Sequence, residues 1–113
     1  MKQVASLVAI LALLLLAAFL EVGGDALMRT GLHATGTTRV VRLLAGTAAL
    51  AAYGTFVNLG PWDFGRVLGT YVVLFFIVAQ IVNWVGFGLA PSWPVLLGGS
   101  LIFSGGAVLV FFG

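Results

Sequence analysis

Four long apolar segments, separated by short links, dominate the chain. They cover residues 4–28, 40–59, 67–89 and 94–112. A helix needs about 20 apolar residues to cross the hydrocarbon core of a bilayer, and each segment is close to or above that length. The runs are continuous rather than alternating, which argues against membrane-spanning β-strands. The pattern predicts an all-α membrane protein in which residues 1–113 form a single four-helix domain.

The links between the segments carry residues that favour turns. The second link contains Pro61 and two glycines, and the third contains Pro91 and Pro94. Gly and Pro in such positions end helices. Trp62 and Trp93 lie at the edges of predicted spans, where amphipathic rings favour the membrane interface. We therefore expect tight turns at the membrane surface.

Composition agrees with this assignment and excludes several functions. Hydrophobic residues make up 62% of the 113 residues and charged residues 7%, whereas a soluble domain usually carries about a quarter charged residues. The mean hydropathy is +1.23. A net charge of +2 provides no basic stripe for nucleic acid. The sequence has no cysteine and no recognisable nucleophile–base pair, metal cluster or cofactor loop. We expect neither an enzyme nor a metal, cofactor or nucleic-acid partner.

The start of the chain resembles a secretory signal, because Lys2 precedes an apolar run. The run is long, however, and no clear cleavage site precedes Glu21. The helical pattern also continues to Met28. We therefore expect a retained first membrane span.

The basic residues give little bias for orientation. With four spans, Lys2 and Arg66 lie on one side of the membrane, and Arg29, Arg39 and Arg42 lie on the other. Because the Lys and Arg content of the loops sets topology, three against two is a weak preference. This count is compatible with two alternatives. One is a fixed orientation with the first loop in the cytoplasm, and the other is insertion in both orientations. The second alternative would allow an antiparallel dimer.

Candidate chemistry is concentrated on the first span. Residues 67–113 contain no Asp, Glu, Lys or Arg, whereas Glu21, Asp25 and Arg29 follow one another at intervals of four. Each step of four rotates by only about 40° around a helix, so the three share one face. Ionisable groups inside a membrane span are costly and mark ion or substrate pathways by default. The alternative is an ion-pair ladder near the interface, and for Asp25 we favour pairing with Arg29.

A carboxyl group in apolar surroundings is harder to ionise than one in water. It can therefore hold a proton near neutral pH and exchange it for a cation. One acidic site that cannot hold both ligands at once couples their opposite movements. This chemistry predicts a proton-coupled exporter, with Glu21 as the acid.

The second span carries four polar residues, Thr47, Tyr53, Thr55 and Asn58. We interpret them as groups that bond to their own backbone or to a neighbouring helix.

Several motifs resemble the small multidrug resistance (SMR) family. The stretch EVGGDALMR at 21–29 resembles the first-helix signature, with its single membrane Glu. Segment 61–71, with its Pro, Gly-Arg-Val and Tyr71, resembles the YnfA-like branch of that family. The family also has seven-spaced glycines in the fourth helix, and here they are Gly98 with Gly105 and Gly99 with Gly106.

The resemblance implies a multi-pass transporter of small organic cations in the bacterial inner membrane. It implies a homodimer, antiparallel or of dual topology, with the four glycines of the fourth helix at the interface. Glu21 would carry the proton or the cation, and Tyr71 would face it. If Asp25 also faced the cavity, it would add a second acid that is unusual in the family. The sequence differs from the family at Asp25, where a small or neutral residue is usual. It also has Val-Val-Leu-Phe at 72–75 in place of a flexible glycine pair.

Two other functions remain open from the sequence. The chain could be a non-transporting accessory subunit, or half of an obligate heterodimer, in which Glu21 and Asp25 merely pair with Arg29. It could also transport a lipid-linked or anionic metabolite, with Arg29 or Arg66 as the binding group. His33 is interpreted as a solvated loop residue, because no other metal ligand accompanies it.

Overall fold

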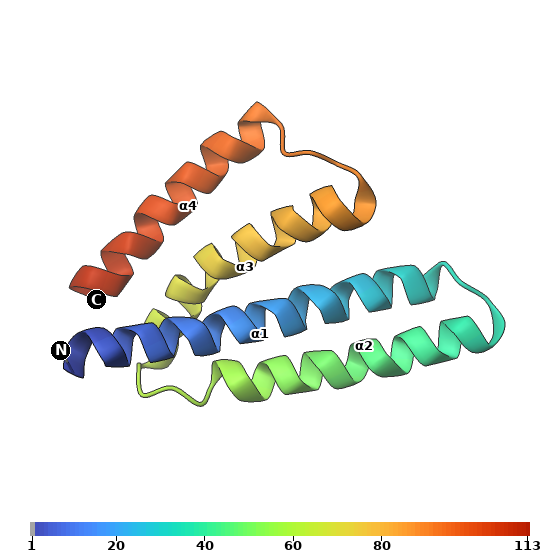
Figure 1. The fold of residues 1–113 in the computed structure, drawn as a ribbon, viewed down its shortest axis with the longest axis horizontal. Helices are drawn as coiled ribbons and strands as arrows, with labels where there is room; N and C mark the ends of the chain where they lie inside the picture. The colour runs from blue at the N-terminus through green and yellow to red at the C-terminus, as the bar shows by residue number, and fades with distance from the viewer. Residues whose placement is uncertain (1) are drawn as a thin grey trace. The chain divides into compact units, whose positions relative to one another are not determined.

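The computed structural model describes residues 2–113 and contains four α-helices (Figure 1). They are α1 (Lys2–Leu32), α2 (Gly36–Val57), α3 (Phe64–Phe87) and α4 (Trp93–Phe112). All four are long and apolar enough to cross a membrane. The predicted all-α architecture with four candidate spans is therefore confirmed, and it indicates a multi-pass membrane protein.

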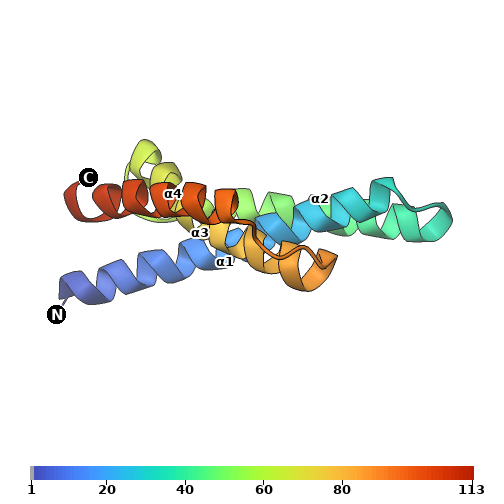
Figure 2. The same cartoon turned by 90° about the horizontal axis from the view of Figure 1, so that it is seen from above.

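The helices form two compact units. The first, the N-terminal hairpin, covers Met1–Leu59 and contains α1 and α2, and the second, the C-terminal hairpin, covers Gly60–Gly113 and contains α3 and α4. Within the N-terminal hairpin, α1 and α2 lie side by side in both ribbon views (Figures 1 and 2). The first link is shorter than expected, because α1 continues to Leu32 and α2 begins at Gly36.

Glycines bring the backbones of α1 and α2 close together. A Cβ atom built on Gly24 would lie 3.1 Å from the Gly46 carbonyl oxygen and 2.9 Å from Leu50 Cγ. A Cβ atom built on Gly46 would lie 3.0 Å from the Gly24 carbonyl oxygen and 3.0 Å from Met28 Cγ. Small residues at helix contacts allow this approach in membranes. The contact fixes the register of the two helices.

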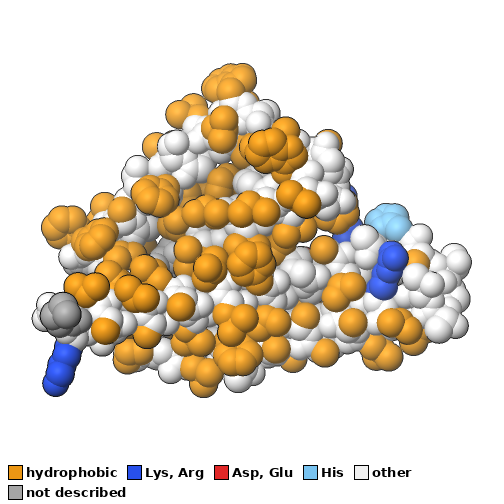
Figure 3. Space-filling model, in the orientation of Figure 1, with side chains coloured by type: hydrophobic (Ala, Val, Ile, Leu, Met, Phe, Trp, Pro, Cys, Tyr) orange, Lys and Arg blue, Asp and Glu red, His pale blue; other side chains and the backbone are white. Residues whose placement is uncertain are grey.

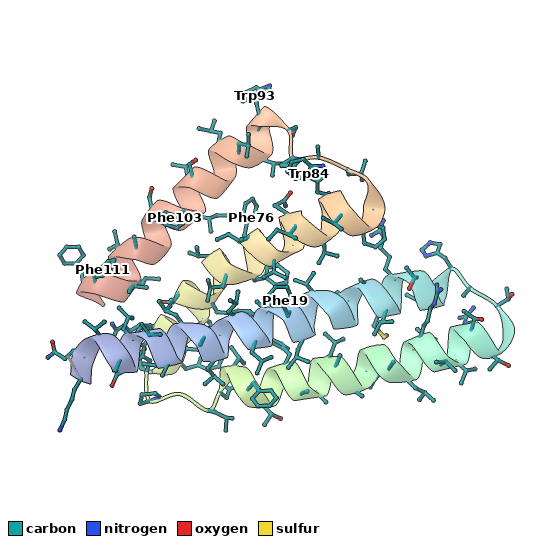
Figure 4. The ribbon with its side chains drawn as sticks, viewed as in Figure 1. Phe19, Phe76, Trp84, Trp93, Phe103 and Phe111 are labelled. Carbon is teal, nitrogen blue, oxygen red and sulfur yellow. The ribbon has the colours of Figure 1, made fainter. Side chains whose placement is uncertain are left out.

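In the C-terminal hairpin, glycines accept large side chains from the facing helix. A Cβ atom built on Gly99 would lie 2.5 Å from Phe76 Cε1, and one built on Gly106 would collide with the side chain of Val73. Figure 4 shows Phe76 directed between α3 and α4, whereas Phe111 points away from α3. The pairing of small with large residues therefore gives close apolar contact between the two helices.

The ends of α3 follow local sequence signals. The Asp63 side chain accepts a hydrogen bond from the Arg66 backbone N–H at 3.1 Å, which caps the first turn. Gly88 ends the helix in the left-handed conformation, with φ of 72°, where glycine is favoured. The surface of the molecule is largely apolar, and Lys, Arg and His gather at a few places in the view of Figure 3. Such a surface suits contact with lipid.

Candidate functional site

The candidate site lies on the facing sides of α1 and α2. Glu21 is half-buried on α1, and Asp25 lies one turn later and is exposed. Tyr53 of α2 is half-buried opposite them and makes a side-chain hydrogen bond with Glu21. Asp25 also interacts electrostatically with the Tyr53 hydroxyl. The hairpin therefore brings two carboxyl groups and one phenol together.

The register of the hairpin explains this arrangement. Gly24 of α1 packs against Gly46 and Leu50 of α2. Because the two helices run in opposite directions, a residue that precedes Gly24 on α1 faces a residue that follows this contact on α2. Tyr53 therefore lies level with Glu21. Tyr53 was expected to bond to its own backbone or to a neighbouring helix, and it bonds to Glu21 of the neighbouring α1. The sequence did not identify Glu21 as that partner. The small-residue pair Gly24 and Gly46 is the signal that could have given the register.

Asp25 and Arg29, for which an ion pair is favoured by the sequence, are both exposed. Their pairing stays a prediction. Their spacing of four places them on one face, but spacing alone does not hold two exposed side chains together in one geometry. The Asp25 carboxylate acts electrostatically on Tyr53, as the Glu21 carboxylate does, but its contribution is the smaller one.

Tyr71, the predicted aromatic partner of Glu21, lies on α3 in the C-terminal hairpin. It is 4% exposed, and its ring lies 6.1 Å from that of Phe75 at an interplanar angle of 44°. Its burial suits either packing or a cavity lining. The position of Tyr71 opposite Glu21 stays a prediction.

The four glycines predicted for a dimer interface divide into two pairs. Gly99 and Gly106 contact Phe76 and Val73 of α3 in the same chain. No atom outside the local helix lies within 4 Å of a Cβ atom built on Gly98 or Gly105. The first pair therefore packs the hairpin, and the second pair is available to another helix.

Arg66 is bound within the C-terminal hairpin. Its Nε donates to the Leu109 carbonyl oxygen at 3.2 Å, and its Nη2 donates to the Val110 carbonyl oxygen at 2.8 Å. The guanidinium carbon also lies 3.7 Å from the centroid of the Trp62 ring. These carbonyls are at the end of α4, where the helix dipole favours a positive charge. The arrangement leaves Arg66 poorly suited to bind an anionic substrate.

The other three polar residues interpreted in this way bond to their own backbone, as expected. The hydroxyls of Thr47 and Thr55 donate to carbonyls four residues earlier, and the Asn58 amide donates to the Gly54 carbonyl. In the described part of the chain, no three His, Asp or Glu residues are grouped as a metal site would require.

Comparison of the chain with models of protein families, with curated proteins and with solved structures finds no match. The resemblance to the small multidrug resistance family therefore stays a prediction that rests on the chain's own motifs.

Proposed function

We propose that the protein is a proton-coupled exporter of small organic cations, with Glu21 as the coupling acid. The observation that carries the proposal is the position of Glu21, on an apolar helix and in a hydrogen bond with Tyr53. A carboxyl group in such a position is costly and is rarely kept without a function. The resemblance to the SMR family supports the same assignment.

The length of α1 supports a position for Glu21 inside the membrane. Lys2 and Arg29 are separated by about 40 Å along the helix axis, which exceeds the hydrocarbon thickness of about 30 Å. If Arg29 lies at the headgroups, Glu21 lies about 12 Å deeper, close to the midplane at about 15 Å. Asp25 then lies about 6 Å deep, nearer to water.

Tyr53 suits both states of a carboxyl group that exchanges a proton for a cation. A tyrosine hydroxyl donates one hydrogen bond and accepts others. It can donate to the ionised carboxylate of Glu21 and accept from the protonated acid. When a cation enters the site from one solution, the proton leaves to that same solution, and when the cation leaves on the other side of the membrane, a proton enters from there. Because one carboxylate cannot hold both, the two movements are coupled.

The exporter is proposed to act as a homodimer, with the outward glycines of α4 at the interface. Gly98 and Gly105 are seven residues apart and therefore lie on one face, and space remains around both. Glycines on such a face allow close contact between helices in a membrane. The nearly equal number of basic residues on the two sides of the membrane gives little bias in orientation. It is therefore compatible with an antiparallel dimer.

The test is transport by purified protein in liposomes under a proton gradient. Candidate substrates are guanidinium, quaternary ammonium and polyamine compounds, and anionic compounds serve as the opposite class. We expect Glu21→Gln to fold and dimerise but to lose proton-coupled transport at least a hundredfold, because an amide cannot exchange charge. Glu21→Asp is the matched control and should keep measurable coupling. Wild-type transport by Glu21→Gln at equal protein levels would contradict the proposal.

A further inference from the structure

The turn end of the N-terminal hairpin carries a cluster of basic side chains. We call this region the hairpin tip, and it comprises residues 29–42. Its ionisable side chains are Arg29, His33, Arg39 and Arg42, all of them exposed. No Asp or Glu occurs between residues 26 and 62. The tip therefore has a formal charge of +3 with His33 neutral.

The three arginines lie at similar levels along the hairpin. A Cβ atom built on Gly31 would lie 3.0 Å from the Arg42 Cβ atom, so Arg42 is level with the last turn of α1. Arg29 lies less than one turn deeper, and Arg39 lies one turn further out on α2. At about 1.5 Å per residue, all three fall within about 9 Å. The headgroup layer of one leaflet is about 5–8 Å thick, so they span its depth.

His33 holds the turn against the end of α1. Its Nδ1 atom lies 2.8 Å from the Arg29 carbonyl oxygen. The link between the helices covers only residues 33–35, so both helix ends are held close together. In Figure 3 the pale blue histidine and a blue basic side chain lie near each other on the visible face, with no acidic side chain beside them. The cluster therefore presents a positive surface at the short turn between the helices.

Exposed apolar side chains accompany the arginines at the tip. They are Leu32, Val40 and Val41, and the exposed Leu44 follows just beyond the tip on α2. A free anion or a nucleic acid would be bound by charge and polar groups alone, and would leave these apolar side chains in water. A phospholipid offers a phosphate to the guanidinium groups and acyl chains to the apolar side chains. The combination therefore favours lipid over a soluble anion.

We propose that the hairpin tip binds the phosphates of anionic phospholipid headgroups. Guanidinium groups suit this partner, because they form paired hydrogen bonds with phosphate oxygens. Basic residues beside a membrane span each contribute about fivefold to attraction toward an anionic leaflet. The other basic residues provide no similar surface, since Arg66 donates to the carbonyls of Leu109 and Val110. Lys2 is a single charge at the opposite end of α1.

The test is lipid binding by the full chain in a mild detergent, counted by native mass spectrometry. One arm titrates short-chain phosphatidylglycerol, a second short-chain phosphatidylcholine, and a third inorganic phosphate as competitor. We expect phosphatidylglycerol to bind at least tenfold more tightly than phosphatidylcholine. Arg29→Gln, Arg39→Gln and Arg42→Gln together should weaken its binding about a hundredfold. Lys2→Gln is the control and should leave the binding unchanged.

Three outcomes would overturn the proposal. One is equal binding of the two lipids by the wild type, and another is wild-type preference in the triple variant. The third is displacement of the lipid by inorganic phosphate at equal concentration, which would indicate a soluble-anion site. If the triple variant does not fold, the single variants decide, since each should lose about fivefold. A triple Arg→Lys variant, which keeps the charge, should retain a preference for phosphatidylglycerol.

Discussion

The two hairpins have similar lengths and hydropathy but different chemistry. Six of the eight charged residues lie in the N-terminal hairpin, and residues 67–113 contain none. The close contact between α1 and α2 is between backbones, at Gly24 and Gly46. The close contacts between α3 and α4 place large side chains, such as Phe76, into glycine positions.

This difference separates binding from scaffolding in the proposed transporter. Backbone contact at Gly24 and Gly46 fixes the register that places Tyr53 against Glu21. In the C-terminal hairpin two apolar helices pack together, and the Arg66 side chain of α3 binds carbonyl oxygens at the end of α4. Substitutions in the N-terminal hairpin should therefore mainly lower transport activity, and substitutions in the C-terminal hairpin should mainly lower stability. Four sets of substitutions test this contrast.

The largest effect on stability is expected for Gly106→Leu in the C-terminal hairpin. The new side chain would collide with Val73, so α3 and α4 would separate, at a cost of about 3 kcal/mol. Unfolding in mild detergent with increasing SDS, followed by circular dichroism, measures this cost.

Gly105→Leu is the matched control, because nothing lies within 4 Å of a Cβ atom there. It should leave the stability of the hairpin unchanged and weaken the proposed dimer, as detected by crosslinking. Equal stability of the two variants would show that the inward and outward glycines are not distinct. A fully crosslinked Gly105→Leu dimer would place the interface elsewhere.

Arg66→Gln should destabilise the C-terminal hairpin by about 2 kcal/mol. The variant loses charge-assisted hydrogen bonds to Leu109 and Val110 and the stacking on Trp62. The value is below the sum for fully buried groups, because Arg66 is only half-buried. The same SDS unfolding measures it, with cation transport as the second readout. Arg66→Lys keeps the positive charge but lacks the paired N–H donors of the guanidinium group. It should lower the free energy of unfolding by about half as much. Loss of transport by folded Arg66→Gln would instead give Arg66 a role in the site.

The sequence was sufficient to predict four apolar helices, because continuous runs of about 20 apolar residues have few other solutions in a membrane. It was not sufficient to predict where α1 ends and where α2 begins. The Gly and Thr residues of 31–38 indicated a link, yet most of them are helical, and Gly31 packs against Arg42 and Leu43. Tertiary contact here outweighs weak helix propensity.

Neither the partner of Glu21 nor the roles of the glycines followed from spacing. Tyr53 could be assigned only once the register of α1 against α2 was known. Gly105 and Gly106 have the same spacing to Gly98 and Gly99, but adjacent residues point about 100° apart on a helix. Only the position of α3 distinguishes the inward pair from the outward pair.

Asp25→Asn is expected to change substrate preference about tenfold. Because Asp25 and Glu21 both interact with Tyr53, the two acids together suit a doubly charged cation such as a polyamine. The variant should lose about tenfold in transport of dications, equivalent to about 1.4 kcal/mol. Transport of monocations should change less than threefold. Equal effects on both classes, or none, would favour a structural role for Asp25 on α1. Arg29→Gln is a useful control, because it keeps both acids and dication transport should persist.

The smallest effect is expected for alanine at the two adjacent glycines of α1. Replacing glycine by alanine in a helix favours the helix by about 1 kcal/mol where space allows. Nothing lies within 4 Å of a Cβ atom built on Gly23, so Gly23→Ala should raise stability by up to that amount. At Gly24 the Cβ atom would lie 2.9 Å from Leu50 Cγ and 3.1 Å from the Gly46 carbonyl oxygen. Because a backbone atom cannot rotate away, α1 and α2 must separate.

The cost at Gly24 should exceed the gain in helix propensity, so Gly24→Ala should lower the free energy of unfolding by about 1 kcal/mol. Separation would also move Tyr53 away from Glu21, so cation transport should fall severalfold even under conditions where the protein remains folded. Gly23→Ala should transport as the wild type does. Opposite signs in stability, with a transport loss confined to Gly24→Ala, would tie the proposed activity to the register of the N-terminal hairpin. The same sign in both variants would mean that the contact at Gly24 and Gly46 is loose enough to accept a methyl group, and that something other than backbone contact positions Tyr53.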